Sequence, residues 1–232
     1  MNAITKRGKN RFDGTVYFFM QNQDLAGKTN YQAVKDTEDP ESEREKLDEF
    51  SNYITGLSLG GPIIKDKVFF FFNAEFQRQK TPQPFDFETY QGNSSQEDID
   101  ALRAHMLNQY GYETGGYLNN VDELKGNKFV VRLDWNINKV HKLMFRYSYV
   151  DNEATQPYTS NNQNLYYLNC GRLFPNKTNT TSLELKSQWS NYSNSLLVGF
   201  TAVRDDRDPL GSNFPSIIID DDGADIRIGS EP

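Results

Sequence analysis

Residues 127–152 read NKFVVRLDWNINKVHKLMFRYSYVDN, in which apolar side chains occupy every second position on either side of a short polar interruption. The first run places on one face Phe129, Val131, Leu133, Trp135 and Ile137, and the second run does the same with Leu143, Phe145, Tyr147 and Tyr149. Successive side chains of a β-strand point to opposite faces, so this alternation predicts two strands with one apolar and one polar face. The few residues between the runs predict a hairpin with a tight turn.

Two more segments have the same design. Residues 53–79 alternate on both sides of Lys65, Asp66 and Lys67, and residues 180–204 alternate around a short polar turn at residues 191–194. A further strand is expected over residues 14–23, which brings the number of predicted strands to seven. The sequence therefore predicts an all-β chain whose strands form an antiparallel meander.

The connections between these strands differ in length in a regular way. The turns within hairpins take a few residues, whereas the connections between hairpins cover residues 26–50, 80–126 and 151–178. Short turns at one end and long loops at the other are typical of transmembrane β-barrels of the outer membrane. Trp135 and Trp189 both lie within a few residues of a short turn, where the aromatic girdle of a barrel is expected. We therefore predict the strands of such a barrel, which this chain alone does not close.

The composition agrees with this fold class. Hydrophobic residues make up 36% and aromatic residues 13% of the chain, and the mean hydropathy is −0.76, which favours half-exposed strands over a helical core. The net charge of −7 argues against a nucleic-acid partner, because phosphate binding needs a basic surface. The single cysteine, Cys170, excludes an intrachain disulfide framework. The sequence has no run of about 18 apolar residues and no signal-peptide pattern, as expected of barrel strands taken from a longer precursor.

The long connections carry signals of their own. Loop 26–50 has eight acidic and four basic residues and is expected to be solvated. In loop 80–126, Ser94 and Glu97 fit a capping box, apolar residues follow at helical spacing, and Gly111 supplies a stop signal. We therefore predict one short amphipathic helix in this loop, with an apolar stripe that packs locally.

Three stretches of the sequence resemble a known family. Residues 2–10 (NAITKRGKN) followed by residues 12–14 (FDG) resemble the segment that ends the plug and opens the barrel in TonB-dependent outer-membrane receptors, particularly the Oar-like, OmpA-related group. Residues 60–71 (GGPIIKDKVFFF) look like the second hairpin element of that group, and residues 132–137 (RLDWNI) with 141–143 (HKL) look like a third. Their order and spacing also match those of the family.

The resemblance implies a domain organisation. Residues 1–13 would be the end of the plug and the link to the barrel, and Met1 would mark a truncated start. Residues 14–205 would be the first seven barrel strands with their extracellular loops, and residues 206–232 the start of a further extracellular loop. Because members of the family have about 22 strands, this chain would be the N-terminal part of the barrel domain.

The resemblance also implies a function. A receptor of this kind lies in the outer membrane of a Gram-negative bacterium and takes up a nutrient with energy delivered through TonB. The expected partners are outer-membrane lipid, TonB through the plug, a glycan or peptide nutrient, and a surface lipoprotein, without nucleic acid and without a cofactor.

Candidate ligand contacts lie in loop 151–178. Tyr158, Tyr166 and Tyr167 stand there among many Asn and Gln residues, and aromatic rings and amides suit sugars or peptides. The alternative is an ordinary polar surface loop, and the sequence leaves both open.

Metal binding and catalysis find little support. Asp220, Asp222 and Asp225 faintly resemble a calcium loop but lack the spaced ligands and the final Glu of an EF-hand, so an acidic loop is the alternative. His105 and His141 have no Ser, Cys or carboxylate partner pattern nearby in the sequence. We therefore expect a protein that is not an enzyme. Two alternatives to the receptor stay open: a soluble β-rich ligand-binding or adhesion module of the cell surface, and a polysaccharide-acting enzyme.

Overall fold

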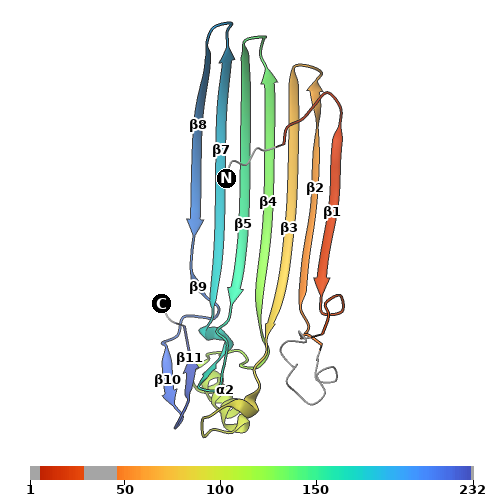
Figure 1. Cartoon of the computed structure of the whole chain (residues 1–232). Helices are drawn as coiled ribbons and strands as arrows, with labels where there is room; N and C mark the ends of the chain where they lie inside the picture. Colours follow the sequence, from red (N-terminus) through yellow and green to blue (C-terminus); the bar gives the residue numbers. More distant parts are fainter. Residues whose placement is uncertain (1–5, 29–45, 231–232) are drawn as a thin grey trace.

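Seven long strands form one antiparallel sheet in a computed structural model that describes residues 6–28 and 46–230. The strand order is β1-β2-β3-β4-β5-β7-β8 (Figure 1), and β1 and β8 are its edges within the described residues. The bounds are β1 Asp13–Asn22, β2 Ser51–Ile64, β3 Val68–Gln83, β4 Asn120–Asn136, β5 His141–Gln156, β7 Arg172–Gln188 and β8 Ser193–Asp205, with the two-residue β9 (Asp208–Pro209) added to β7. The predicted fold class is confirmed. Residues 2–5 of the first motif and most of loop 26–50 lie outside the described residues.

The strand register explains the alternation in the sequence. The row of paired residues through Val131 reads Leu59, Phe72, Val131, Tyr147, Thr181 and Phe200. One position further along, on the other face, the row through Val130 reads Ser58, Asn73, Val130, Ser148, Thr180 and Thr201. The sheet therefore has an apolar face and a polar face, as the period of two requires.

The apolar face is exposed over most of its width. Val198 on β8 is 59% exposed and Val16 on β1 is 81% exposed. On β3 the apolar residues from Val68 to Phe76 extend over about 27 Å, close to the apolar band of about 25 Å of an outer-membrane barrel. Trp135 and Trp189 are half-exposed at the short-turn end, which is where a girdle would lie. No helix among the described residues is long and apolar enough to cross a membrane.

The strands are longer than the alternation indicates. β3 continues to Gln83 and β4 begins at Asn120, so they shorten the predicted loop 80–126 at both ends. Likewise β5 continues to Gln156 and β7 begins at Arg172, within the predicted loop 151–178. These extensions are mostly polar, and their few apolar residues, such as Val121, Leu124, Leu173 and Phe174, do not alternate regularly. Hydrogen bonding between neighbouring strands therefore holds them without a periodic apolar signal in the sequence.

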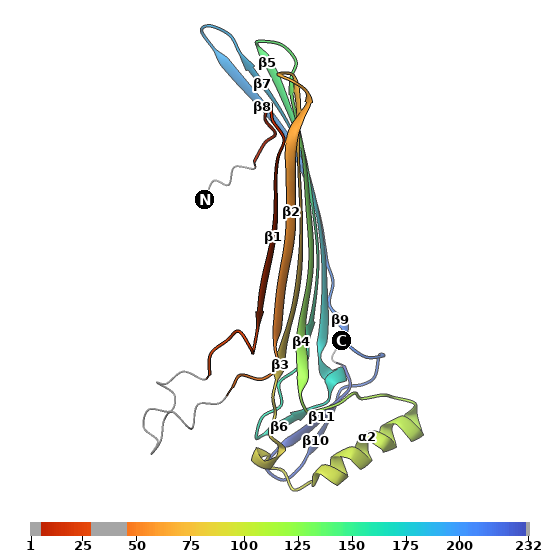
Figure 2. The same cartoon turned by 90° about the vertical axis from the view of Figure 1, so that its right-hand side faces the viewer.

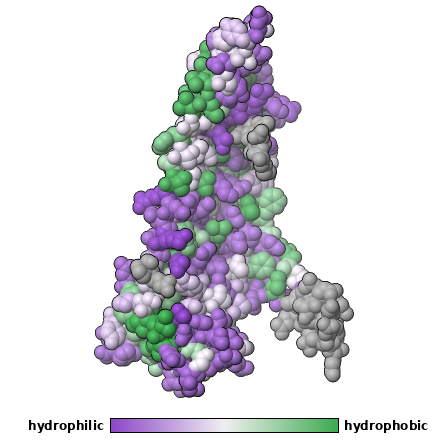
Figure 3. Space-filling view, turned by 60° about the vertical axis from the view of Figure 1, so that its left-hand side comes forward, coloured by the Kyte–Doolittle hydropathy of each residue, from purple (hydrophilic) through white to green (hydrophobic). Residues whose placement is uncertain are grey.

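The long loops fold together into a small unit at the end of the sheet opposite the short turns (Figure 2). We call residues 84–119, 157–171 and 210–230 the loop domain. It contains the helices η1 Phe87–Thr89, α2 Gln96–Tyr110 and η2 Leu168–Cys170, and a mixed three-stranded sheet of β10 Ile217–Asp220, β11 Asp225–Ile228 and β6 Asn164–Tyr166. Apolar patches interrupt the hydrophilic surface along the large sheet, and a further patch lies on the loop domain (Figure 3).

The predicted helix exists, but its N-cap is one residue later than the sequence suggested. Ser95, not Ser94, accepts a hydrogen bond from the backbone N–H of Asp98, and Asp98 accepts from the backbone N–H of Ser95. The Ser95 hydroxyl also holds the pKa of the Asp98 carboxyl below its usual value. Ser94 instead donates to Asp221 in the β10–β11 turn, and this tertiary contact overrides the local pattern. Gly111 ends the helix with φ = +62°, as predicted.

Replacing Ser95 by Ala is expected to fray the first turn of α2 at a cost of about 1 kcal/mol, because the N–H of Asp98 loses its acceptor. Hydrogen exchange of the α2 amides in the full protein would measure the effect. Ser94→Ala is the matched control and should leave these amides protected. Fraying in Ser94→Ala but not in Ser95→Ala would contradict the assigned cap.

Candidate functional site

The three family-like stretches meet at the short-turn end of the sheet. A recess of about 440 Å³ is lined there by residues from all three: Arg7, Gly8, Lys9 and Asn10 from the first, Asp66 and Phe69 from the second, and Arg132, Asp134, Trp135, Asn136, Lys142 and Leu143 from the third. The sequence places these stretches up to about 130 residues apart, and the β2–β3–β4–β5 pairing brings them together. We call this the short-turn recess.

The segment before β1 packs closely against the polar face. A Cβ on Gly8 would clash with the backbone oxygens of Gly61 and Phe70, so only glycine fits there. Gly60 faces Gly8, and the ring of Phe12 lies over Gly61 on the apolar face. Gly60 and Gly61 therefore let neighbouring parts of the chain approach the two faces of the sheet closely.

Asn10 and Asn136 clamp the first short turn between them. Asp66 has φ = +63° at the tip of this turn, and its backbone N–H donates to Asn10 Oδ1 at 2.8 Å. Asn10 Nδ2 donates back to the Asp66 carboxylate. From the other side, Asn136 Nδ2 donates to the Asp66 carbonyl oxygen at 2.9 Å, and the Asn136 N–H donates to Lys67 O at 2.8 Å. Segment 7–10 is therefore tied to the sheet at a defined place.

Charged side chains gather on the polar face beside this recess. Arg132 forms a two-pronged ion pair with Asp134, with both N–O distances 2.8 Å and both side chains largely buried. Arg146 lies directly across from Arg132, and its buried Nε has no hydrogen-bond partner among the described residues. A like-charged pair opposed across two strands is unfavourable unless a further polar group compensates it. This face is thus suited to a polar partner or to water.

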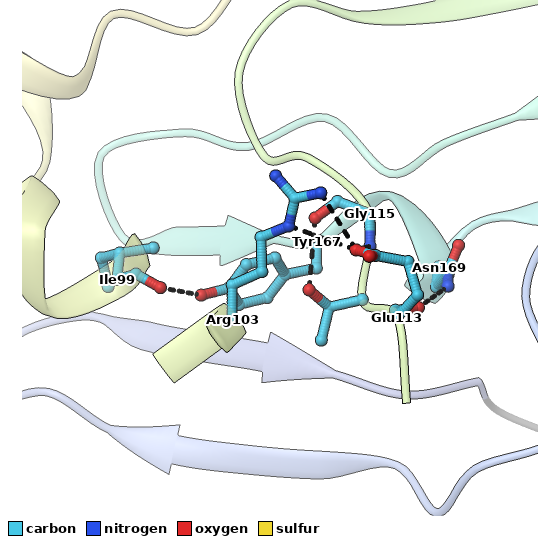
Figure 4. Close-up of polar contacts among 7 residues, drawn as sticks. Ile99, Arg103, Glu113, Gly115, Tyr167 and Asn169 are labelled. Atoms are coloured by element: carbon cyan, nitrogen blue, oxygen red, sulfur yellow. Dashed lines mark hydrogen bonds and ion pairs between the residues drawn. The ribbon is translucent and has the colours of Figure 1, made fainter. Parts of the chain in front are cut away.

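The loop domain holds the hydrophobic core of the described residues. Its buried members come from three separate loops and are Ile99, Met106, Tyr112, Tyr117, Leu165, Tyr167, Cys170, Ile226 and Ile228. Tyr167 is fully buried, and its hydroxyl donates to the Ile99 carbonyl oxygen at 2.6 Å (Figure 4). Arg103 binds Glu113 at 3.1 Å, and Glu113 also accepts from the Gly115 N–H, which fixes α2 against the chain that follows it (Figure 4).

Burial raises the pKa of the Tyr167 phenol well above its ordinary value of 10.0, with Tyr117 as a further cause. Because this pKa is raised in the folded state, the protonated phenol stabilises the fold fully below pH 10.0. That stabilisation is lost as the pH rises through the folded-state pKa. We expect the packing of the loop domain to be lost at alkaline pH, and near-ultraviolet circular dichroism would follow this loss. In Tyr167→Phe the signal should change less steeply with pH than in the wild type. Tyr110→Phe, at a 63% exposed ring, should match the wild type. An unchanged transition in Tyr167→Phe would contradict this expectation.

The structure separates the three predicted ligand residues. Tyr167 belongs to the core, so its ring does not reach the surface. Tyr158 and Tyr166 are half-buried neighbours with ring centroids 5.1 Å apart, and both line a small recess. Ligand contact remains a prediction for this pair.

The acidic residues of the last loop form the turn between β10 and β11. Asp225 pairs with Arg227 at 3.0 Å, and Asp220 accepts from the Asp222 N–H. Asp221, which the sequence did not single out, accepts from Tyr90 and from Ser94 and so ties this hairpin to the first long loop. No group of three or more metal-ligating side chains occurs in the part of the chain that the structure describes. Here the alternative interpretation, an acidic loop, accounts for the contacts observed.

One contact between catalytic residue types was not visible in the sequence. His141 Nδ1 lies 2.7 Å from Ser187 Oγ, because His141 and Ser187 are paired across β5 and β7. Ser187 is only 4% exposed, and the imidazole also makes an edge-to-face contact with the Trp189 ring, with centroids 5.6 Å apart. The pair links two strand ends at the short turns.

A family model described as outer membrane beta barrel domain matches residues 4–116. These residues include the segment before β1 and the whole β1–β2–β3 unit. This is an outer-membrane β-barrel protein. No curated protein and no solved structure matches the chain significantly.

The place of the barrel protein in the outer membrane gives its two ends different surroundings. In barrels of this kind the short turns face the periplasm and the long loops face the outside. This orientation would place the short-turn recess at the periplasmic end and the loop domain at the extracellular end. The family match also sets aside the soluble β-rich module that the sequence left open.

Proposed function

We propose that this protein is a TonB-dependent receptor that captures a nutrient with its extracellular loops and imports it through the barrel. The observation that carries the proposal is the position of residues 7–10 on the polar face at the periplasmic end. The polar face of a transmembrane barrel faces its lumen. A segment that reaches the first strand from the lumen is what a plug domain joined to its barrel requires.

Further features support this proposal. The segment is tied to the wall through Asn10 and Gly8, and the polar face beside it carries the Arg132–Asp134 pair and Arg146, whose buried Nε has no hydrogen-bond partner among the described residues. Charged groups of this kind suit a wall that meets a polar domain or water inside the lumen. The apolar face would contact outer-membrane lipid, and the loop domain would meet the nutrient and, where present, a surface lipoprotein. TonB would act through a plug.

The proposal assigns no catalytic residue and no cofactor. The one Ser–His contact described above has a buried serine, and its imidazole packs on Trp189. We therefore propose no nucleophilic role for Ser187.

Uptake assays on the full-length protein would test the proposal. Cells carrying the protein, and cells lacking it, would be given labelled peptide and oligosaccharide pools with and without functional TonB. We expect protein-dependent accumulation that disappears without TonB, while binding to the cell surface persists. Accumulation that continues without TonB, or that does not depend on the protein, would refute the proposed function.

A further inference from the structure

A recess of about 600 Å³ opens where β7 meets the loop domain, and Arg172, Arg207, Phe214 and Ser230 line its walls. A smaller recess of about 130 Å³ adjoins it and contains Tyr158, Tyr166 and Arg227, with Ser216 lining both. The combined space is within the usual range for small-molecule sites. We call the two together the arginine recess.

Three guanidinium groups face this space, and each lies over an aromatic ring. The distances from guanidinium carbon to ring centroid are 5.2 Å for Arg172 over Tyr158, 5.5 Å for Arg207 over Phe174 and 5.6 Å for Arg227 over Tyr166. Stacking of this kind holds a guanidinium in place. Arg227 is held in addition by hydrogen bonds that it donates to Asn164 at 3.2 Å and to Asp225 at 3.0 Å. The arginines are therefore positioned before any ligand arrives.

The recess is positively charged in a chain with a net charge of −7. Two carboxylates offset two of the three arginine charges. Asp208 lines the recess, and Asp225 pairs with Arg227 at 3.0 Å. Arg207 is exposed and has no ion pair with any residue that the structure describes. The acidic surface elsewhere on the protein repels an anionic ligand, so such a ligand would be drawn to this positive site.

The position of the recess suits a ligand bound for the lumen. Arg172 and Phe174 lie on β7 at the same alternation as Ser182, which pairs with Arg146 on the polar face. Both side chains therefore belong to the polar face, at its extracellular end. The recess therefore lies at the loop-domain end of the polar face that also carries Arg146 and Arg132.

We infer that the arginine recess binds the carboxylate group of the incoming nutrient. The planar fork of a guanidinium matches the two oxygens of a carboxylate, and Asn213, Ser216 and Ser230 add amide and hydroxyl groups for the rest of the ligand. This inference rests on the proposed function in one respect, namely that the bound ligand is then imported. Binding of the carboxylate can be measured without any transport. An acidic oligosaccharide and an acidic peptide share the required chemistry.

Binding to the full-length protein in detergent would test the inference, with trigalacturonate and triglutamate as acidic probes and with their neutral counterparts, maltotriose and trialanine. At least one acidic probe should bind, and its neutral counterpart should bind at least about tenfold more weakly, because charge-assisted hydrogen bonds are lost. Which acidic probe binds identifies the source of the carboxylate. Equal binding of acidic and neutral probes, or no binding of either acidic probe, would overturn the inference.

Arg207→Gln is the informative variant, since Arg207 is exposed and its removal should not disturb folding. We expect this variant to bind the acidic probe about tenfold more weakly than the wild type and to bind the neutral probe with unchanged affinity. The matched control is Arg204→Gln, because Arg204 is also exposed, three residues away on β8, and already paired with Asp206. Equal effects of the two variants would overturn the assignment to this recess.

Failure of the inference and failure of the proposed function remain distinguishable. If binding depends on Arg207 but uptake does not depend on TonB, the proposed receptor function is refuted and the inferred carboxylate site still holds. TonB-dependent uptake of neutral nutrients, unaffected by Arg207→Gln, would keep the receptor and refute the site.

Discussion

Val131→Arg is expected to destabilise the folded barrel by about 2–4 kcal/mol, since it places a charge at the middle of the surface that faces lipid. Val131 is flanked on the apolar face by Phe72 and Tyr147, and the Tyr147 hydroxyl already donates to Asn179 at 2.7 Å. The full-length variant should fold into liposomes with a much lower yield than the wild type. The shift in electrophoretic mobility between folded and heat-unfolded barrel would measure that yield.

Val130→Arg is the matched control, because it has the same residue type one position away and points to the opposite face. Its neighbours across the strands are Asn73 and Ser148, so the new guanidinium meets polar groups and water. We expect near-normal folding. If both variants fold equally well, or both equally badly, the assignment of the two faces is wrong.

Leu165→Ala is expected to open the loop domain while the barrel stays folded. Leu165 is fully buried on β6, where the loop of residues 157–171 meets β11, and removal of a buried leucine side chain costs about 2–5 kcal/mol. A small core that loses this much is expected to unfold locally. Limited proteolysis of the full-length protein in detergent should therefore cut the long loops quickly and leave the strands intact.

Leu107→Ala tests whether burial is the cause of this effect. Leu107 lies on α2 in the same domain but is 46% exposed, so its loss should change proteolysis little. Rapid cleavage of this variant, or a resistant Leu165→Ala, would contradict the assigned core. Both variants should keep the folded mobility of the barrel.

The large sheet was predictable because its signal is local and repeated. In each hairpin the alternation of Leu, Phe, Tyr and Val with polar residues fixes which face meets lipid, and residues such as Asp66 mark the turns. Every residue of β4 from Phe129 to Trp135 could thus be assigned to a face from the sequence alone. The strand extensions beyond this band were missed, because they are mostly polar and lack a regular alternation, which makes them look like loops.

The loop domain was not predictable, because its order depends on contacts between distant residues. β6 has three residues and β11 four, too few for a periodic pattern, and they pair in parallel across about 60 positions of sequence. Tyr167 therefore read as a surface tyrosine in a polar loop, although it fills the core. Similarly, Ser94 read as a helix cap because its contact with Asp221, 127 residues away, leaves no trace in the local sequence.

The candidate sites were only partly predictable for the same reason. The three family-like stretches were visible one by one, but their convergence on a single recess follows from strand pairing. In the loop domain, Tyr158 and Tyr166 were singled out from composition, whereas the arginines stacked on aromatic rings were missed. Arg172, Arg207 and Arg227 are widely spaced and have no motif, so only the fold brings them together.

The construction of the loop domain has a consequence for the order in which the molecule matures. Its core combines Ile99, Leu165 and Ile228, so it cannot close until the chain has been made as far as β11 and three loops have reached the same side of the membrane. Contacts between such distant residues form late, because a long loop must close before they are gained. The loop domain is therefore the last part of the described chain to fold, and it then holds together the ends of strands that are already inserted.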